Sequence, residues 1–215
     1  MNDITFDRAA NAEQKKEDIE WLRIWCDEVN DEKLPHVALI GDSITEGYYP
    51  FVKSALSGIA RVDYLATSYS VASAMYQETV RNFVKDSAYA AVHYNYGLHA
   101  YAVDEETYEA RCRELIQFLA VQSRAVIATT TIVLDNTLRA EDPSWKDKVI
   151  ARNEKLMAIA EELKLDVDDL NAVCKTFDEA SRNPDGVHFT ESGYKTLADH
   201  VAAGIRKQLE QIRKI

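Results

Sequence analysis

The stretch that decides the fold of this chain is Val37-Ala38-Leu39-Ile40-Gly41-Asp42-Ser43-Ile44-Thr45-Glu46-Gly47. Its four apolar residues, bounded by polar ones, predict a short buried strand that stops at a glycine. Because glycine tolerates conformations that other residues avoid, Gly41 allows the backbone to leave the strand at a sharp angle. Ser43 is therefore expected at the carboxyl end of the strand, where an open parallel sheet places its active site.

Other interpretations of this stretch predict different roles for the serine. Ser43-Ile44-Thr45-Glu46 has the spacing of a capping box, in which Ser43 would cap a helix. A phosphate-binding loop is disfavoured, because that motif continues with Lys-Ser or Lys-Thr and here Tyr48 follows the second glycine. The nucleophile elbow of the α/β-hydrolases requires glycine two residues after the serine, at the position of Thr45. A nucleophilic serine and a helix cap remain as the two alternatives.

A short segment near the other end supplies partners for a nucleophilic serine. Asp185-Gly186-Val187-His188 places an aspartate three residues before a histidine in a loop that contains glycine. A serine hydroxyl becomes an effective nucleophile when an imidazole takes its proton, and a carboxylate fixes the tautomer of that imidazole. Ser43, His188 and Asp185 are therefore the candidate catalytic residues.

These two segments resemble the first and last sequence blocks of the SGNH (GDSL-type) hydrolases, a family of esterases and lipases. Gly41-Asp42-Ser43-Ile44 matches the first block and Asp185-x-x-His188 the last, in the right order and with a spacing close to a family domain. The resemblance implies the α/β class, as a flavodoxin-like three-layer α/β/α sandwich with a five-stranded parallel sheet. It assigns residues 35–215 to a single hydrolase domain, and we interpret residues 1–34 as a helical extension packed on it.

The two middle blocks of the family, which supply its oxyanion hole, are altered in this chain. Ser70 falls where family members have a glycine; it can still supply the backbone N–H, although it could equally cap the next helix. In the third block, Gly-x-Asn-Asp, Gly97 is matched but His99 stands at the asparagine position. A neutral imidazole N–H can donate as an amide does. The alternative donors are Asn95 and a bound water.

Composition and charge indicate a globular protein of one domain. The chain has 215 residues, of which 47% are hydrophobic and 28% charged, enough to bury a substantial core. Its net charge of −11 disfavours nucleic acid and anionic membranes as partners, since their phosphates would be repelled. Because the sequence lacks His and carboxylate clusters with metal-site spacing, neither a metal nor an organic cofactor is expected.

The cysteines and the amino-terminal sequence bear on the cellular compartment. Cys26, Cys112 and Cys174 are far apart and odd in number, which favours reduced core thiols over a disulfide framework. The first residues have neither a basic start nor a continuous apolar run, and no stretch is long enough to span a bilayer. We therefore expect a cytoplasmic protein.

Hydrophobic periodicity predicts strands that alternate with helices, which implies a parallel sheet covered on both faces. Strands are expected at residues 37–40, 61–66, 88–94, 124–133 and 165–170. Helices are expected at residues 13–29, 72–85, 104–121, 146–163 and 190–214, with a further short helix ending near Gly58. His93 is expected to be a satisfied core histidine. Asn136, Arg139 and Trp145, on the predicted carboxyl side of the sheet, are candidate substrate contacts.

Together these features predict a serine esterase that acts on a small-molecule ester, either a short-chain acyl ester or an acetylated saccharide. The alternatives are a thioesterase or lysophospholipase-type acyl hydrolase, and a non-catalytic binding module with a decayed oxyanion hole. The sequence leaves the substrate and the oligomeric state open. Aromatic residues expected near the site could stack on a sugar ring or line an acyl groove: Tyr48, Tyr49, Tyr69, Tyr96 and Trp145.

Overall fold

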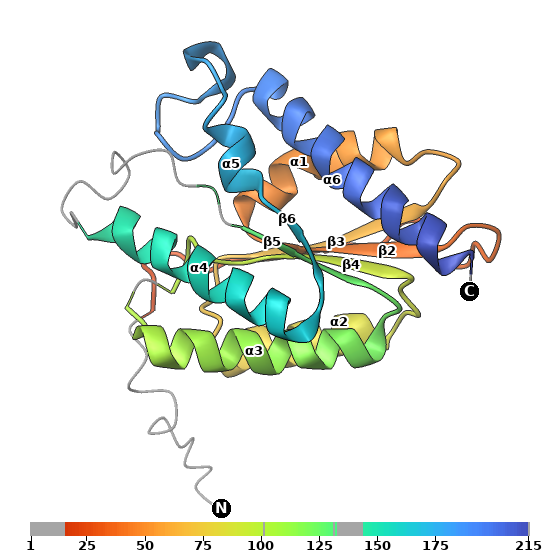
Figure 1. The fold of residues 1–215 in the computed structure, drawn as a ribbon, viewed down its shortest axis with the longest axis horizontal. Coiled ribbons are helices and arrows are strands. Elements are labelled where there is room, and N and C mark those ends of the chain that lie inside the picture. The colour runs from red at the N-terminus through yellow and green to blue at the C-terminus, as the bar shows by residue number, and fades with distance from the viewer. Residues whose placement is uncertain (1–15, 101, 131, 133–143, 215) are drawn as a thin grey trace, which may run out of the picture.

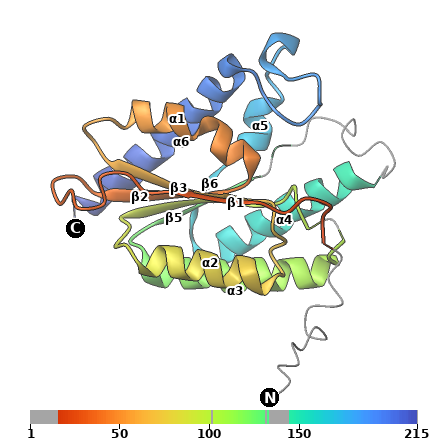
Figure 2. The same cartoon turned by 180° about the vertical axis from the view of Figure 1, so that it is seen from behind.

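The computed structural model describes residues 16–100, 102–130, 132 and 144–214. The fold is a three-layer α/β/α sandwich, in which helices cover both faces of one sheet (Figures 1 and 2). Within the described residues, six strands form this sheet in the order β1-β3-β2-β4-β5-β6. The α/β class and the three-layer arrangement expected from the sequence are confirmed.

The strands are β1 (Leu22–Trp25), β2 (His36–Gly41), β3 (Arg61–Thr67), β4 (Ala91–Asn95), β5 (Val126–Thr129) and β6 (Asp166–Asp168). Every neighbouring pair from β3 to β6 is parallel, and these are the strands that the sequence predicted. The five parallel strands lie in the order β3-β2-β4-β5-β6, which is the strand order of the flavodoxin-like folds.

Strand β1 differs from the sequence prediction for the amino-terminal region. The helix expected over residues 13–29 is wrong for the described part, because Leu22 to Trp25 pair antiparallel with β3. The free edge of β3 offers backbone N–H and C=O groups that a strand satisfies and a helix does not, and this outweighs the helical periodicity. The five parallel strands expected from the sequence are present, but the prediction of a five-stranded sheet missed β1, which adds an antiparallel edge strand.

The helices are α1 (Ser43–Ala55), α2 (Ala74–Lys85), α3 (Glu105–Gln122), α4 (Trp145–Leu163), α5 (Leu170–Cys174) and α6 (Glu191–Ile212), with a 3₁₀ turn, η3 (Glu179–Ser181). The longer helices lie within a few residues of their predicted positions, whereas α5 and η3 were not expected. Among the described helices, none has the length and hydrophobicity needed to cross a membrane.

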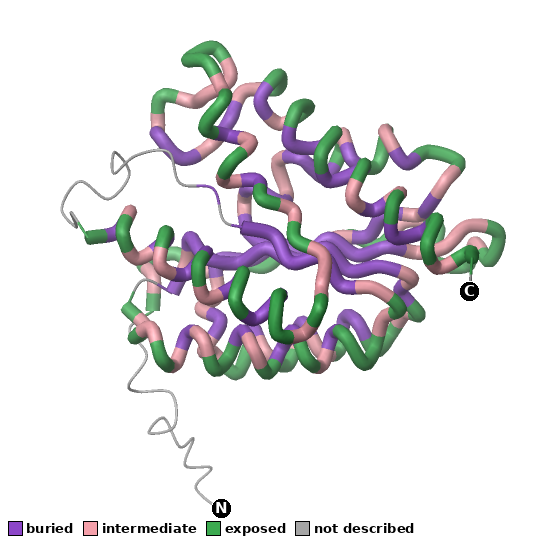
Figure 3. The backbone as a smooth tube through the Cα atoms, in the orientation of Figure 1, coloured by how far each residue is buried: buried purple, intermediate pink, exposed green. Residues whose placement is uncertain are grey.

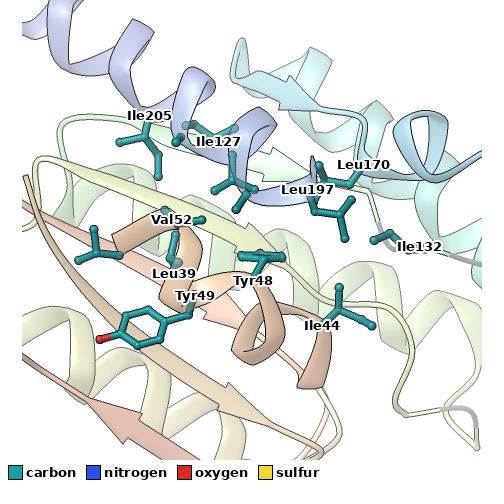
Figure 4. Packing of buried hydrophobic residues seen from close by; sticks show 14 of the residues in the cluster. Leu39, Ile44, Tyr48, Tyr49, Val52, Ile127, Ile132, Leu170, Leu197 and Ile205 are labelled. Carbon is teal, nitrogen blue, oxygen red and sulfur yellow. The ribbon is translucent and has the colours of Figure 1, made fainter. Parts of the chain in front are cut away.

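Two hydrophobic cores lie on opposite faces of the sheet, because successive residues of a strand point to opposite faces. Val37 and Leu39 of β2 pack in the core beneath α1, α5 and α6. Ala38 and Ile40 pack in the core against α2, α3 and part of α4. The central strands are therefore buried along their length (Figure 3). Figure 4 shows the first core, where side chains of the sheet meet those of α1 and α6.

Several predictions for individual core residues can be compared with the structure. His93 is fully buried, with Nε2 2.8 Å from Thr129 Oγ1 and 3.1 Å from Asp168 Oδ2, so its prediction as a satisfied core histidine is confirmed. Cys112 and Cys174 are buried free thiols, as expected. The prediction is wrong for Cys26, which is exposed beside the edge strand β1.

Gly41 permits close contact between the end of β2 and the first turn of α1. A β-carbon at Gly41 would lie 2.0 Å from Thr45 Oγ1, 2.8 Å from Thr45 Cβ and 3.2 Å from the carbonyl oxygen of Asn95. Among the described glycines, positive φ angles occur at Gly58 and Gly186. Glycine is therefore required at position 41 by close packing, and not by a special backbone angle.

We predict that Gly41→Ala lowers the free energy of unfolding by roughly 1–3 kcal/mol, since the added methyl group overpacks the junction. The matched control is Gly204→Ala in α6, where the nearest atom to an added β-carbon is Ile127 Cδ1 at 3.8 Å. Alanine is the better helix former, so the control is expected to be neutral or more stable by up to about 1 kcal/mol. Denaturant unfolding measures both, and equal midpoints for the two variants would contradict the packing argument.

Candidate active site

Three sequence-predicted site residues follow neighbouring strands of the sheet. β2 pairs with β3 on one side and with β4 on the other, and both pairings are parallel. Ser43 follows β2, Ser70 follows β3, and His99 follows β4. Because parallel strands end at the same edge, the structure brings these residues to the carboxyl edge of the sheet, where the chain changes its winding direction.

Ser43 is the first residue of α1 and does not cap it. The N-cap is Asp42, whose Oδ1 accepts a hydrogen bond of 2.9 Å from the backbone N–H of Ile44. The capping-box interpretation is therefore wrong for Ser43, and its hydroxyl is left for another partner. The helix N-terminus also carries partial positive charge, which favours negative charge developing beside Ser43.

The Asp42 side chain is fully buried behind the nucleophile position. Burial raises the pKa of the Asp42 carboxyl, and the charges of His99 and His188 act in the opposite direction. Both histidines therefore act on the charge of the residue before Ser43.

Ser43, His188 and Asp185 form a continuous hydrogen-bonded chain. His188 Nε2 lies 2.9 Å from Ser43 Oγ, and His188 Nδ1 lies 2.6 Å from Asp185 Oδ2. The nucleophile, base and carboxylate proposed from the sequence are thus brought together across 145 residues of chain. Such an arrangement allows the imidazole to take the serine proton while the carboxylate holds its tautomer.

The turn over residues 185–188 fixes the Asp185 carboxylate. Asp185 Oδ1 accepts the backbone N–H groups of Val187 and His188 at 2.9 and 2.8 Å, and Gly186 has a φ of 74°. Partial burial works to raise the pKa of Asp185, but these two N–H groups and the His188 ring outweigh it, so its pKa lies below the ordinary value of 3.8. Asp185 is therefore ionised at neutral pH.

The packing of α6 on α1 holds this turn beside Ser43. The two helices lie side by side on one face of the sheet (Figures 1 and 2). A β-carbon at Gly47 would lie 2.2 Å from the Tyr194 ring, so Gly47 leaves the space that this ring fills. The start of α6, which begins three residues after His188, thereby packs on the first turns of α1.

Ser70 lies in the loop between β3 and α2. Its Oγ accepts a hydrogen bond of 3.2 Å from the backbone N–H of Ala72, but α2 begins only at Ala74. The N-cap of α2 is Ser73, which bonds the N–H of Tyr76. The alternative interpretation of Ser70 as the helix cap is therefore wrong.

His99 has a partner that the sequence did not suggest. Its Nδ1 lies 3.0 Å from each carboxylate oxygen of Glu17, in the segment before β1. The two residues are 82 positions apart, and Glu17 carries no local motif that marks it as a site residue. Asn95, the alternative donor considered from the sequence, is the buried last residue of β4.

Arg152 of α4 fixes the backbone of the loop that carries His99. Its Nη1 donates to the carbonyl oxygens of His99 at 2.8 Å and Gly97 at 3.3 Å, and its Nη2 donates to those of Ala100 at 2.8 Å and Val103 at 3.4 Å. The residue is 1% exposed. A signal was present in the sequence, since Arg152 lies three residues after Val149 and four before Leu156 on the apolar stripe of its helix.

Among the expected substrate contacts that the structure describes, most are buried. Asn136 and Arg139 lie outside the described residues. Trp145 is 2% exposed and packs in the first core, so its prediction as a substrate contact is wrong. Of the other aromatic residues, Tyr69 is partly exposed, while the remaining three are buried: Tyr48, Tyr49 and Tyr96. In the part of the chain that the structure describes, no group of three His, Cys, Asp or Glu residues is placed to hold a metal ion.

No protein-family model and no curated protein matches the sequence. The fold is similar to that of a GDSL-like lipase from Bacteroides thetaiotaomicron, with 19% identity, a TM-score of 0.66, and 80% of this chain and 88% of that chain covered. A lipase/acylhydrolase from Enterococcus faecalis matches with 16% identity and a TM-score of 0.67 over 81% and 96% of the two chains.

A mutant of an acetyl-xylooligosaccharide esterase from Geobacillus stearothermophilus matches with 20% identity and a TM-score of 0.61, over 81% of this chain and 94% of that chain. In each case the alignment extends over most of both chains, so the similarity concerns the whole domain and not a shared βαβ unit. The chain therefore has the fold of the GDSL-type lipases and esterases, the fold that its two terminal sequence blocks predict.

Proposed function

We propose that the protein is a serine hydrolase that cleaves carboxylic esters through an acyl-enzyme intermediate. The observation that carries the proposal is the hydrogen-bonded chain from Ser43 Oγ through His188 to Asp185, with distances of 2.9 and 2.6 Å. If Ser43 only began a helix, it would need neither the imidazole of His188 nor the carboxylate of Asp185. The assembled chain therefore favours an enzyme over a non-catalytic binding module.

In the first half of the reaction, Ser43 Oγ attacks the ester carbonyl carbon while its proton passes to His188 Nε2. The tetrahedral intermediate collapses, the bond to the alcohol oxygen breaks, and the alcohol leaves with the proton from His188. In the second half, water attacks the acyl-enzyme and gives a proton to His188. The acid then leaves, and Ser43 recovers its proton. Asp185 stays ionised and stabilises the imidazolium in both halves.

We assign the oxyanion hole to the backbone N–H groups of Ser43 and Ser70 and to the side chain of His99. All three follow strands that end at one edge of the sheet, with β2 between β3 and β4. Donors fixed by backbone and packing need no reorganisation as charge develops on the carbonyl oxygen. The four bonds from Arg152 to the loop after β4 support such rigidity.

The substrate class that we favour is a short-chain acyl ester, with an acetylated saccharide as the leading candidate. Tyr48, Tyr49 and Tyr96 are packed in the cores and offer no surface to a long acyl chain. Tyr69 retains an exposed part that could stack on a sugar ring. The structural neighbours include both an acetyl-xylooligosaccharide esterase and lipases, so a panel of acyl lengths with acetylated sugars separates this class from thioesterase or lysophospholipase activity.

The nucleophile is tested by covalent labelling. We expect an organophosphonate probe to label the native chain on Ser43 and to leave Ser43→Ala unlabelled, and we expect the native chain to hydrolyse p-nitrophenyl acetate well above buffer. Ser54→Ala serves as a control, since this serine lies on the same helix but away from its N-terminus. Labelling of Ser43→Ala at the native rate would exclude Ser43 as the nucleophile.

Loss of His188 is expected to reduce kcat more than loss of Asp185. Loss of the base in His188→Ala should reduce kcat by roughly 10⁴ to 10⁶, and loss of the orienting carboxylate in Asp185→Ala by measurably less. Steady-state kinetics on variants whose folding is confirmed by circular dichroism measures both. Equal losses would count against this order of roles.

The pH dependence follows from the same two groups. The pKa of Asp185 is lowered, so this carboxylate remains ionised from pH 8 to pH 5 and does not cause a loss of activity in that range. His188 accepts the serine proton only when its ring is neutral, so kcat/KM should fall as the solution is acidified towards pH 5. A rate that stays constant from pH 8 to pH 5 would contradict a histidine base.

A further inference from the structure

The segment before β1 is fastened to the carboxyl edge of the sheet. The backbone N–H of Trp21 donates to Ser68 Oγ at 2.9 Å, and the Trp21 carbonyl oxygen accepts bonds from Thr67 Oγ1 at 2.6 Å and from the Ser68 N–H at 3.1 Å. Ser68 Oγ also donates to the carbonyl of Ile19 at 3.3 Å. Since Thr67 and Ser68 lie at the end of β3, these bonds bring the segment alongside the loop that carries Ser70.

This attachment brings the Glu17 carboxylate to His99. Both Glu17 oxygens lie 3.0 Å from His99 Nδ1. The side chains retain only 14% exposure at Glu17 and 16% at His99, so the pair is largely removed from water. An ion pair or charged hydrogen bond in such surroundings is screened less than one on the open surface.

The pair of Glu17 and His99 lies at the same edge of the sheet as Ser43. His99 follows β4, which lies directly beside β2, the strand that leads to Ser43. The charge on His99 also acts on the buried Asp42 carboxyl, immediately before Ser43. Among the described residues, the acidic groups that act on His99 include Glu17 from the segment before β1 and Asp42 from the end of β2. Arg152 of α4 bonds the carbonyl oxygen of His99 itself.

The Glu17 contact determines which ring nitrogen of His99 carries a proton. An ionised carboxylate only accepts hydrogen bonds, so the shared proton belongs to Nδ1. A neutral imidazole carries a single N–H, and with that N–H at Nδ1, the lone pair of Nε2 would face any developing negative charge. The doubly protonated ring, in contrast, donates from both nitrogens.

We propose that Glu17 is a positioning residue that holds His99 as an imidazolium, whose Nε2–H donates to the oxyanion. This inference rests on the proposed function, in which His99 occupies the place of the asparagine donor found in the resembling family. It replaces the neutral-ring donor considered from the sequence with a charged donor and its counter-ion. Charge-assisted hydrogen bonds are roughly twice as strong as neutral ones, which suits a donor that acts on an oxyanion.

The test is a double-mutant cycle on hydrolysis of p-nitrophenyl acetate, with Glu17→Gln, His99→Asn and the double variant. Glu17→Gln should lower kcat by roughly 10- to 100-fold and change KM by less than about twofold. The reason is that the hydrogen bond to the oxyanion, which this variant weakens, forms mainly in the transition state. In the His99→Asn background the amide N–H needs no counter-ion. There, adding Glu17→Gln should change kcat less than about twofold.

The matched control is Glu20→Gln in the same segment. Glu20 has 13% side-chain exposure, close to that of Glu17, and its ionic partner is Lys16 at 3.4 Å. We expect this variant to keep the native kcat. If both glutamate variants lower kcat alike, or if Glu17→Gln lowers kcat equally in both His99 backgrounds, Glu17 merely anchors the segment and the inference is overturned.

Other outcomes separate this inference from the proposed function. An active native enzyme with an unaffected Glu17→Gln variant overturns the role of Glu17 alone. A rise in kcat for Glu17→Gln also overturns it, since the carboxylate would then obstruct the oxyanion hole. A native chain that neither hydrolyses the ester nor labels at Ser43 overturns the esterase proposal itself, and the inference with it.

Discussion

The structure depends on the parallel pairing of β2 between β3 and β4. The residues that follow parallel strands lie at one edge of the sheet, so this pairing brings the loops after β3 and β4 to the same edge as Ser43, which follows β2. Pairing on both sides, together with helices over both faces, removes residues 37–40 of β2 from water, which is why these four residues are all apolar. The apolar run that predicts the strand from the sequence is thus a consequence of the strand's central position in the sheet.

A second constraint brings His188 to Ser43. Residues 185–188 belong to no strand of the sheet, and their position is set by the seating of α6 on α1. Gly47 and Tyr194 form part of this contact, one helical turn beyond Ser43. The tight turn around Gly186 then aligns the Asp185 carboxylate by its own backbone N–H groups. The hydrogen-bonded chain of Ser43, His188 and Asp185 therefore depends on helix packing, which places His188, and on the local turn, which places Asp185.

The sequence was sufficient where local pattern and tertiary context agree. The apolar run over 37–40 predicted the central strand, and Ser43 with the Asp185-x-x-His188 spacing predicted the three residues that the structure brings together. The alternation of strands and helices, with the family resemblance, predicted the layers. The sequence failed for Leu22 to Trp25, because a short segment with apolar residues on several sides satisfies helical and extended patterns alike, and the open edge of β3 selected the strand. Glu17 lies shortly before that strand, so the error in this short element also concealed the contact of Glu17 with His99.

The hydrogen bonds of Arg152 connect the loop that carries His99 to the buried core. Four carbonyl oxygens of the loop after β4 are held by one buried guanidinium, which also lies over the Tyr108 ring of α3 at 4.5 Å. Opening of this loop would cost the buried Arg152 side chain its four carbonyl acceptors. We therefore expect the backbone amides of the loop that carries His99 to exchange with solvent together with those of α3 and α4, and more slowly than those of surface loops.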